Sequence, residues 1–138
     1  MKSFGAQAST PPNQATLDAK FFQGLSDPTR IEILELLLRG ERNVSEIVSE
    51  IGGSQSRVSN HLACLRWCGF VTTRREGLFV YYYICDPRVR EILRLGQEVA
   101  REHEEGLLTC VRLPSPGKGE PEYAEAADNT SARLAPVD

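Results

Sequence analysis

The sequence predicts a mainly α-helical domain with a small β-hairpin near its C-terminal end, and three observations support this. Apolar residues recur at helical spacing in four successive segments between residues 15 and 68. Residues 70–84 then form two aromatic- and valine-rich runs on either side of a glycine-containing turn. A further helical pattern follows at residues 86–105. Helices followed by a hairpin in this order predict a winged helix-turn-helix.

The four predicted helices have recognisable starts and stops. A short polar residue precedes three of them, at Asp27, Asn43 and Ser54, where its side chain can cap the first turn. Glycines end the second, third and fourth helices. We expect helices at residues 15–25, 28–39, 44–51 and 55–68. Their expected core side chains are Leu17, Phe21, Phe22, Ile31, Leu34, Leu37, Leu38, Val44, Ile47, Val48, Ile51, Val58, Leu62 and Leu65.

The hairpin and the last helix complete the expected fold. The strands are predicted at residues 70–74 and 78–84, with Arg75-Glu76-Gly77 as the basic tip. The apolar set of the last helix is broader than one stripe, which indicates burial on two sides, by its own domain and by a second subunit. We therefore expect a dimer with terminal dimerisation helices. That apolar set comprises Val89, Ile92, Leu93, Leu95, Gly96, Val99 and Ala100.

The length and composition favour one soluble domain. In a chain of 138 residues we expect a flexible leader at 1–14, a winged helix-turn-helix and dimerisation domain at 15–113, and a disordered tail at 114–138. No apolar run approaches the roughly 20 residues that span a bilayer, and the N-terminus lacks a secretory signal pattern. A cytoplasmic protein without membrane contact is expected. Its four cysteines are then free thiols, metal ligands or redox sensors rather than disulfides.

The distribution of charge favours double-stranded DNA as a partner, although the net charge is −3. Residues 53–75 contain four arginines and no carboxylate, so this segment is locally basic. The fourth helix opens with short polar donors suited to the major groove, where Gln55 and Asn60 could contact adenine and Arg57 guanine or phosphate. The candidate DNA-binding residues are Ser54, Gln55, Ser56, Arg57, Ser59, Asn60, His61, Arg74 and Arg75.

Two thiols lie on the same helix, beyond the candidate DNA-binding residues. Cys64 and Cys68 are four residues apart and therefore share one helix face, at the boundary of the core. Cys110 supplies a third thiol after the last helix, and three thiolates favour a soft ion over zinc, which prefers a fourth ligand. Cd(II) and Pb(II) fit such a site, and Hg(II) or As(III) also could. Cys85 is expected to be a small buried hydrophobe at the end of a strand.

Three segments resemble the ArsR/SmtB family of dimeric winged-helix repressors over about residues 17–105: LSDPTRIEILELLL, SRVSNHLACLRWCGFV and RREGLFVYYYI. The run Ser59 to Leu62, with the following Cys-Leu-Arg-x-Cys-Gly, is most similar to the cadmium- and lead-sensing CmtR type. The resemblance implies a homodimer on a palindromic operator, released when the effector metal binds. It also implies that Cys64, Cys68 and Cys110 are the metal ligands, with Cys110 contributed by the opposite subunit.

Two other functions stay open on the residues alone. A thiol-redox-sensing repressor of the same fold would oxidise Cys64 or Cys68 and pair it with Cys110. A non-sensing DNA-binding module would carry structural cysteines only. An enzyme is not expected, because the sequence shows no nucleophile–base set, no phosphate loop and no paired carboxylates in an apolar setting.

Overall fold

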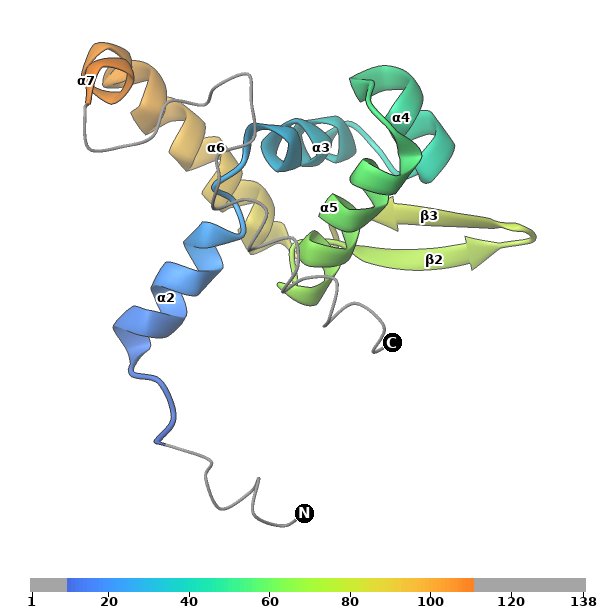
Figure 1. Cartoon of the computed structure of the whole chain (residues 1–138), viewed down its shortest axis with the longest axis horizontal. Coiled ribbons are helices and arrows are strands. Elements are labelled where there is room, and N and C mark those ends of the chain that lie inside the picture. The colour runs from blue at the N-terminus through green and yellow to red at the C-terminus, as the bar shows by residue number, and fades with distance from the viewer. Residues whose placement is uncertain (1–9, 111–138) are drawn as a thin grey trace.

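The computed structural model describes residues 10–110, which form six helices and three strands (Figure 1). The predicted tail at 114–138 and most of the predicted leader lie outside these residues. In chain order the elements are α2 (Gln14–Gln23), α3 (Pro28–Leu38), β1 (Arg42–Asn43), α4 (Val44–Ile51), α5 (Gln55–Trp67), β2 (Thr72–Glu76), β3 (Phe79–Tyr83), α6 (Pro87–Glu102) and α7 (Glu104–Thr109).

The predicted helix caps are confirmed. The side chains of Asp27, Asn43 and Ser54 each accept a hydrogen bond from the backbone N–H three residues later, at 2.9–3.1 Å. At Asn43 the bond is reciprocal, because the Glu46 carboxylate also accepts the backbone N–H of Asn43 at 2.9 Å. The starts of α3, α4 and α5 are therefore fixed by local chemistry that the sequence already displays.

Helices α3, α4 and α5 pack around one apolar core, which the strands and α6 close. The three expected core residues of α5, Val58, Leu62 and Leu65, are buried. In α3 the expected stripe is only partly right, because Ile33 and Leu36 are buried although neither was predicted to be. Since α3 contacts α4, α5 and β3, it has no single buried face that a periodic pattern would reveal.

The sheet has three strands in the order β1-β3-β2, all antiparallel, rather than the two strands predicted. Strand β1 has only two residues, which is too short for an alternating strand pattern to show in the sequence. The hairpin tip is Gly77-Leu78, where Gly77 has a φ of 63°. Arg75 is paired with Val80 inside the hairpin, so its predicted place in the tip is wrong.

The terminal helices leave apolar surface exposed. The predicted last helix is divided at His103 into α6 and α7, and it buries Val89 and Leu93 against the core. Helix α2 has no buried residue and extends away from the core, on the opposite side from the projecting hairpin (Figure 1). The large apolar side chains exposed on these helices are Leu17, Phe22, Leu95, Val99, Leu107 and Leu108. Within residues 10–110 no helix is long and apolar enough to cross a membrane.

Candidate nucleic-acid interface and metal centre

The first half of α5 presents a polar, exposed surface. Because the side chain of Val58 turns into the core, the opposite face of this half faces outward. The N-terminal end of a helix with such short donors suits the major groove of DNA. The predicted DNA-binding residues that are exposed here are Ser54, Gln55, Ser56, Arg57, Ser59 and Asn60.

His61 differs from these residues, because it turns toward the start of α3. Its side chain is only 15% exposed. Its Nδ1 lies 3.3 Å from the guanidinium of Arg30, and its Nε2 lies 4.0 Å from the Asp27 carboxylate. This position does not favour the DNA contact that the sequence predicted for His61.

The two candidate arginines of the hairpin are in different electrostatic situations. Arg74 donates to Glu76 at 2.7 Å and to Glu41 at 2.9 Å, and its guanidinium lies 4.9 Å from the ring centre of Tyr81. The hydrogen bonds from Arg74 hold the pKa of Glu41 below its usual value. Arg75 is exposed, and no carboxylate between residues 10 and 110 pairs with it. Arg75 is therefore the better phosphate-binding candidate.

Cys64 and Cys68 form an interacting thiol pair in the second half of α5. Cys64 is half-buried and Cys68, the C-cap residue, is exposed. A hydrogen bond from the Cys68 thiol lowers the pKa of Cys64 to about 6, and the positive charge of Arg30 acts in the same direction against the effect of burial. The same hydrogen bond raises the pKa of Cys68, and burial adds to this. The hydrogen bond thus favours the thiolate form of Cys64, which is the form in which a cysteine acts as a nucleophile or a metal ligand.

The end of α2 packs closely against this thiol pair. A Cβ atom at Gly24 would lie 3.3 Å from Cys68 Sγ and 3.0 Å from the ring of Phe70. The rings of Phe21 and Phe70 are 4.7 Å apart at their centroids, which fixes the last turn of α2 beside the end of α5. The turn between α2 and α3 therefore lies directly beside the Cys68 sulfur.

The other two cysteines lie apart from this pair. Cys110 follows α7 and is half-buried. No three His, Cys, Asp or Glu side chains between residues 10 and 110 are grouped so as to hold a metal, so one chain does not bring Cys110 to Cys64 and Cys68. Cys85 is exposed, and the prediction of a buried hydrophobe there is wrong. Ile84, the first residue after β3, is buried, whereas Cys85 beyond it faces outward.

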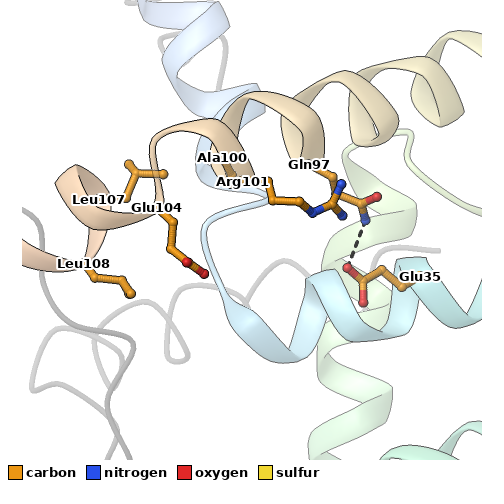
Figure 2. Close-up of a pocket in the computed structure, with 7 residues that line it drawn as sticks. All are labelled: Glu35, Gln97, Ala100, Arg101, Glu104, Leu107 and Leu108. Carbon is orange, nitrogen blue, oxygen red and sulfur yellow. Dashed lines mark hydrogen bonds between the residues drawn. The ribbon is translucent and has the colours of Figure 1, made fainter.

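A groove between α3 and the helices α6 and α7 has different chemistry (Figure 2). Gln97 donates to Glu35 at 2.9 Å across it, and Arg101 and Glu104 contribute opposite charges. It contains no thiol, so it does not resemble a site for a soft ion. Leu107 and Leu108 give the groove an apolar end.

Comparison with known proteins agrees with this geometry. The description "Bacterial regulatory protein, arsR family" matches residues 27–73, which run from the cap of α3 into β2. The chain is 42% identical over 113 residues to a protein of Streptomyces lividans named "Probable mercury resistance operon repressor", covering 82% of this chain and 90% of that one. The regulator CmtR of Mycobacterium tuberculosis is 40% identical over 75 residues, covering 54% of this chain and 64% of CmtR.

The fold has solved counterparts. A homodimeric winged helix-turn-helix DNA-binding domain from Mycobacterium bovis is 36% identical, with a TM-score of 0.62, covering 70% of this chain and 91% of that domain. The resemblance to the CmtR type extends over less of the chain than the similarity to the Streptomyces protein. These relatives are regulators rather than enzymes. The chain belongs to the arsR family of bacterial regulatory proteins.

Proposed function

We propose that this protein is a cytoplasmic transcriptional repressor that binds operator DNA as a homodimer and is released by a thiophilic metal ion. The observation that carries the proposal is the thiol pair Cys64–Cys68, which lies on the same helix as the exposed polar side chains suited to DNA. A metal bound there acts directly on the element that reads the operator. The Streptomyces relative named as a mercury resistance repressor supports this function.

DNA binding would use the first half of α5 in the major groove. Gln55 and Asn60 have amide groups that can pair with adenine, and Arg57 can donate to guanine or phosphate. Arg75 on β2 would contact the phosphate backbone, which positions the protein without reading sequence. The negative overall charge does not oppose this, because salt screens charges more than about 8–10 Å away.

Dimerisation would cover the apolar surface that the single chain leaves exposed. Leu95 and Val99 are 46% and 56% exposed on α6, and Leu17 and Phe22 are similarly exposed on α2. Apolar patches of this kind mark protein interfaces. The Mycobacterium bovis relative is described as homodimeric, which supports the same arrangement here. A two-fold dimer would then bind a palindromic operator.

The thiol pair sets the chemistry of the effector. Two thiolates satisfy Hg(II), a soft ion that binds two sulfurs well. Cd(II) and Pb(II) would need a third sulfur, which Cys110 from the second subunit would supply, as the resemblance to the CmtR type implies. We therefore propose Hg(II) as the ion that the pair can hold by itself, and Cd(II) or Pb(II) as ions that depend on Cys110.

Release from DNA requires that the metal bind the DNA-free conformation more tightly than the DNA-bound one. Coupling of about 1–3 kcal/mol, or roughly 5–150-fold in affinity, is typical of linked sites. An ion between the end of α5 and the turn after α2 would change the packing of α5 against α2. The orientation of the exposed polar surface in the first half of α5 would change with it.

The purified protein is first used to select a duplex operator from random DNA sequences. The test is then the affinity of the protein for this operator, measured by fluorescence anisotropy. Hg(II) should weaken binding of the wild type by roughly 5–150-fold. Cys64→Ser and Cys68→Ser should abolish this response, and Cys85→Ser, which changes an exposed cysteine outside the pair, should retain it. Cys110→Ser should lose any response to Cd(II) and keep the response to Hg(II). Unchanged DNA affinity in protein shown to have bound the metal would contradict the proposal.

A thiol-redox sensor is the second candidate, and the lowered pKa of Cys64 favours it specifically. A thiolate at neutral pH reacts faster with oxidants than an ordinary thiol. In that case peroxide would weaken operator binding, and dithiothreitol would restore it. Peroxide-induced release together with indifference to Hg(II), Cd(II) and Pb(II) would favour this candidate over the metal sensor.

A further inference from the structure

Arg30, on the first turn of α3, joins three helices through one guanidinium group. Its Nε donates to the carbonyl of Gly24 at 2.7 Å, and one Nη donates to the carbonyl of Gln23 at 3.3 Å. The other Nη lies 3.3 Å from Nδ1 of His61 in the middle of α5. Arg30 therefore connects the end of α2 to the helix that carries both the DNA-reading surface and the thiol pair.

His61 occupies the boundary between those two parts of α5. It directly follows the candidate DNA-binding residue Asn60 and precedes Cys64 by one helical turn. A hydrogen bond from Arg30 requires Nδ1 to be unprotonated, so the ring proton is on Nε2, which faces the Asp27 carboxylate at 4.0 Å. Asp27 also accepts the backbone N–H of Arg30 at 3.1 Å. The ring is thus oriented from both sides by the first turn of α3.

The other contacts of Arg30 lead to the thiol pair. Gly24, whose carbonyl Arg30 binds, is so close to Cys68 that a Cβ there would lie 3.3 Å from the sulfur. There is little room between Cys68 and Gly24, so an ion seated on the α2 side of the sulfur would displace the Gln23–Gly24 turn. Displacing this turn moves two of the three acceptors that hold the guanidinium, and His61 loses its orienting partner.

We propose that Arg30 is a positioning residue that couples occupation of the Cys64–Cys68 pair to the orientation of the DNA-reading half of α5, acting through the Gln23–Gly24 carbonyls and His61. This inference rests on the proposed function and adds the route by which the signal travels. It depends on the planar fork of arginine, because lysine has one nitrogen and cannot reach acceptors on α2 and α5 in the same geometry.

The experiment uses Arg30→Lys and His61→Gln in the full chain, with Arg39→Lys as the matched control. Arg39 is an exposed arginine at the C-cap of the same helix, away from the thiols. Trp67, the one tryptophan of the sequence, directly precedes Cys68, so its fluorescence is the probe of Hg(II) binding at the pair. Operator affinity is measured with and without Hg(II), and thermal unfolding shows whether each variant is folded.

The expected result is that Arg30→Lys and His61→Gln still quench Trp67 with Hg(II) but lose most of the metal-induced weakening of operator binding. Arg39→Lys should behave as the wild type. A merely structural role would lower the unfolding temperature and leave the ratio of operator affinities with and without Hg(II) unchanged. If both variants keep the same ratio of operator affinities with and without Hg(II) as a wild type that responds to the metal, the inference is overturned. The proposed function would still stand.

A metal-free measurement separates this inference from the proposed function. The double-mutant cycle of Arg30→Lys and His61→Gln is applied to operator affinity in the absence of any metal. If the effects of the two substitutions on operator affinity are not additive, Arg30 is coupled through His61 to the DNA-reading half of α5. This holds even if the wild type proves indifferent to Hg(II). Additive effects overturn it, whether or not the wild type responds to the metal.

Discussion

The two halves of α5 share one buried stripe and differ in what their outward side chains contact. In the first half, Gln55–Asn60, the residues that do not face the core are exposed. In the second half, His61 contacts the start of α3, and Cys68 lies against the end of α2. The comparison teaches that one helix can present a solvent-exposed polar surface in one half and a packed, thiol-containing surface in the other. Substitutions of the exposed residues of the first half should change DNA binding alone, whereas those of His61 and the two cysteines in the second half should also change stability or metal binding.

The largest effect should come from the stripe that both halves share. Leu62 is fully buried at their boundary, so Leu62→Ala should lower the free energy of unfolding by about 2–5 kcal/mol through lost burial and the cavity left behind. Urea denaturation measures this. Ser59→Ala, an exposed change one turn earlier, should stay within about 0.5 kcal/mol of the wild type. Equal losses in the two variants would contradict the burial of this stripe.

The next effect concerns the contact of the second half with α2. Gly24→Ala should lower the free energy of unfolding by about 1–3 kcal/mol, because its Cβ would be 3.0 Å from Phe70. It should also weaken Hg(II) binding measured by Trp67 fluorescence, since the methyl group would press on Cys68. Gly106→Ala is the control, because a Cβ there meets no atom within 4 Å. A neutral Gly24→Ala would show that α2 does not pack on the thiols.

Substitutions of exposed residues in the first half of α5 should weaken operator binding and leave stability unchanged. Gln55→Ala and Asn60→Ala should each weaken operator binding by about 1–3 kcal/mol if the amide reads a base. Their free energies of unfolding should stay within about 0.5 kcal/mol of the wild type, because both side chains are exposed. Anisotropy titrations and urea denaturation on the same samples measure the two quantities. A large loss of stability would remove the distinction between the halves.

The smallest effect is chemical rather than structural and is confined to the second half. The Cys68 hydrogen bond lowers the pKa of Cys64 to about 6, so the alkylation rate of Cys64 should rise with pH through a midpoint near that value. In Cys68→Ala the hydrogen bond is lost and the pKa of Cys64 should rise, which moves the midpoint to higher pH. Iodoacetamide labelling followed by mass spectrometry measures both rates. A midpoint that does not move would show that Cys68 is not the cause.

The features that the sequence could predict are those with short-range causes. A cap needs a residue and a backbone group three positions apart, so the starts of α3, α4 and α5 were predicted correctly. The thiol pair was visible for the same reason, because four residues of a helix make one turn. The contact of Cys110 with the thiol pair of the other subunit stays a prediction, because it involves two chains and the structure describes one.

The features that the sequence could not show depend on contacts between distant residues. Strand β1 has two residues and exists because Arg42 and Asn43 pair with β3, some 40 residues later. Arg30 and His61 are 31 positions apart, and nothing local to either residue signals their contact. Cys85 was misassigned because an apolar run does not by itself show which of its residues face inward.

Asn43 belongs to two elements at once, and this has a consequence for how operators are chosen. It pairs with Tyr81 in the sheet and caps α4 through its bond with Glu46. Asn43 thus ties the wing to the start of α4, and the neighbouring pair of Arg42 with Tyr82 adds a second connection. In the proposed homodimer, the distance between the two α5 helices would then be an adjustable quantity. Operators would then be distinguished by the spacing of their half-sites, set against a helical repeat of about 34 Å, as well as by the bases within each half-site.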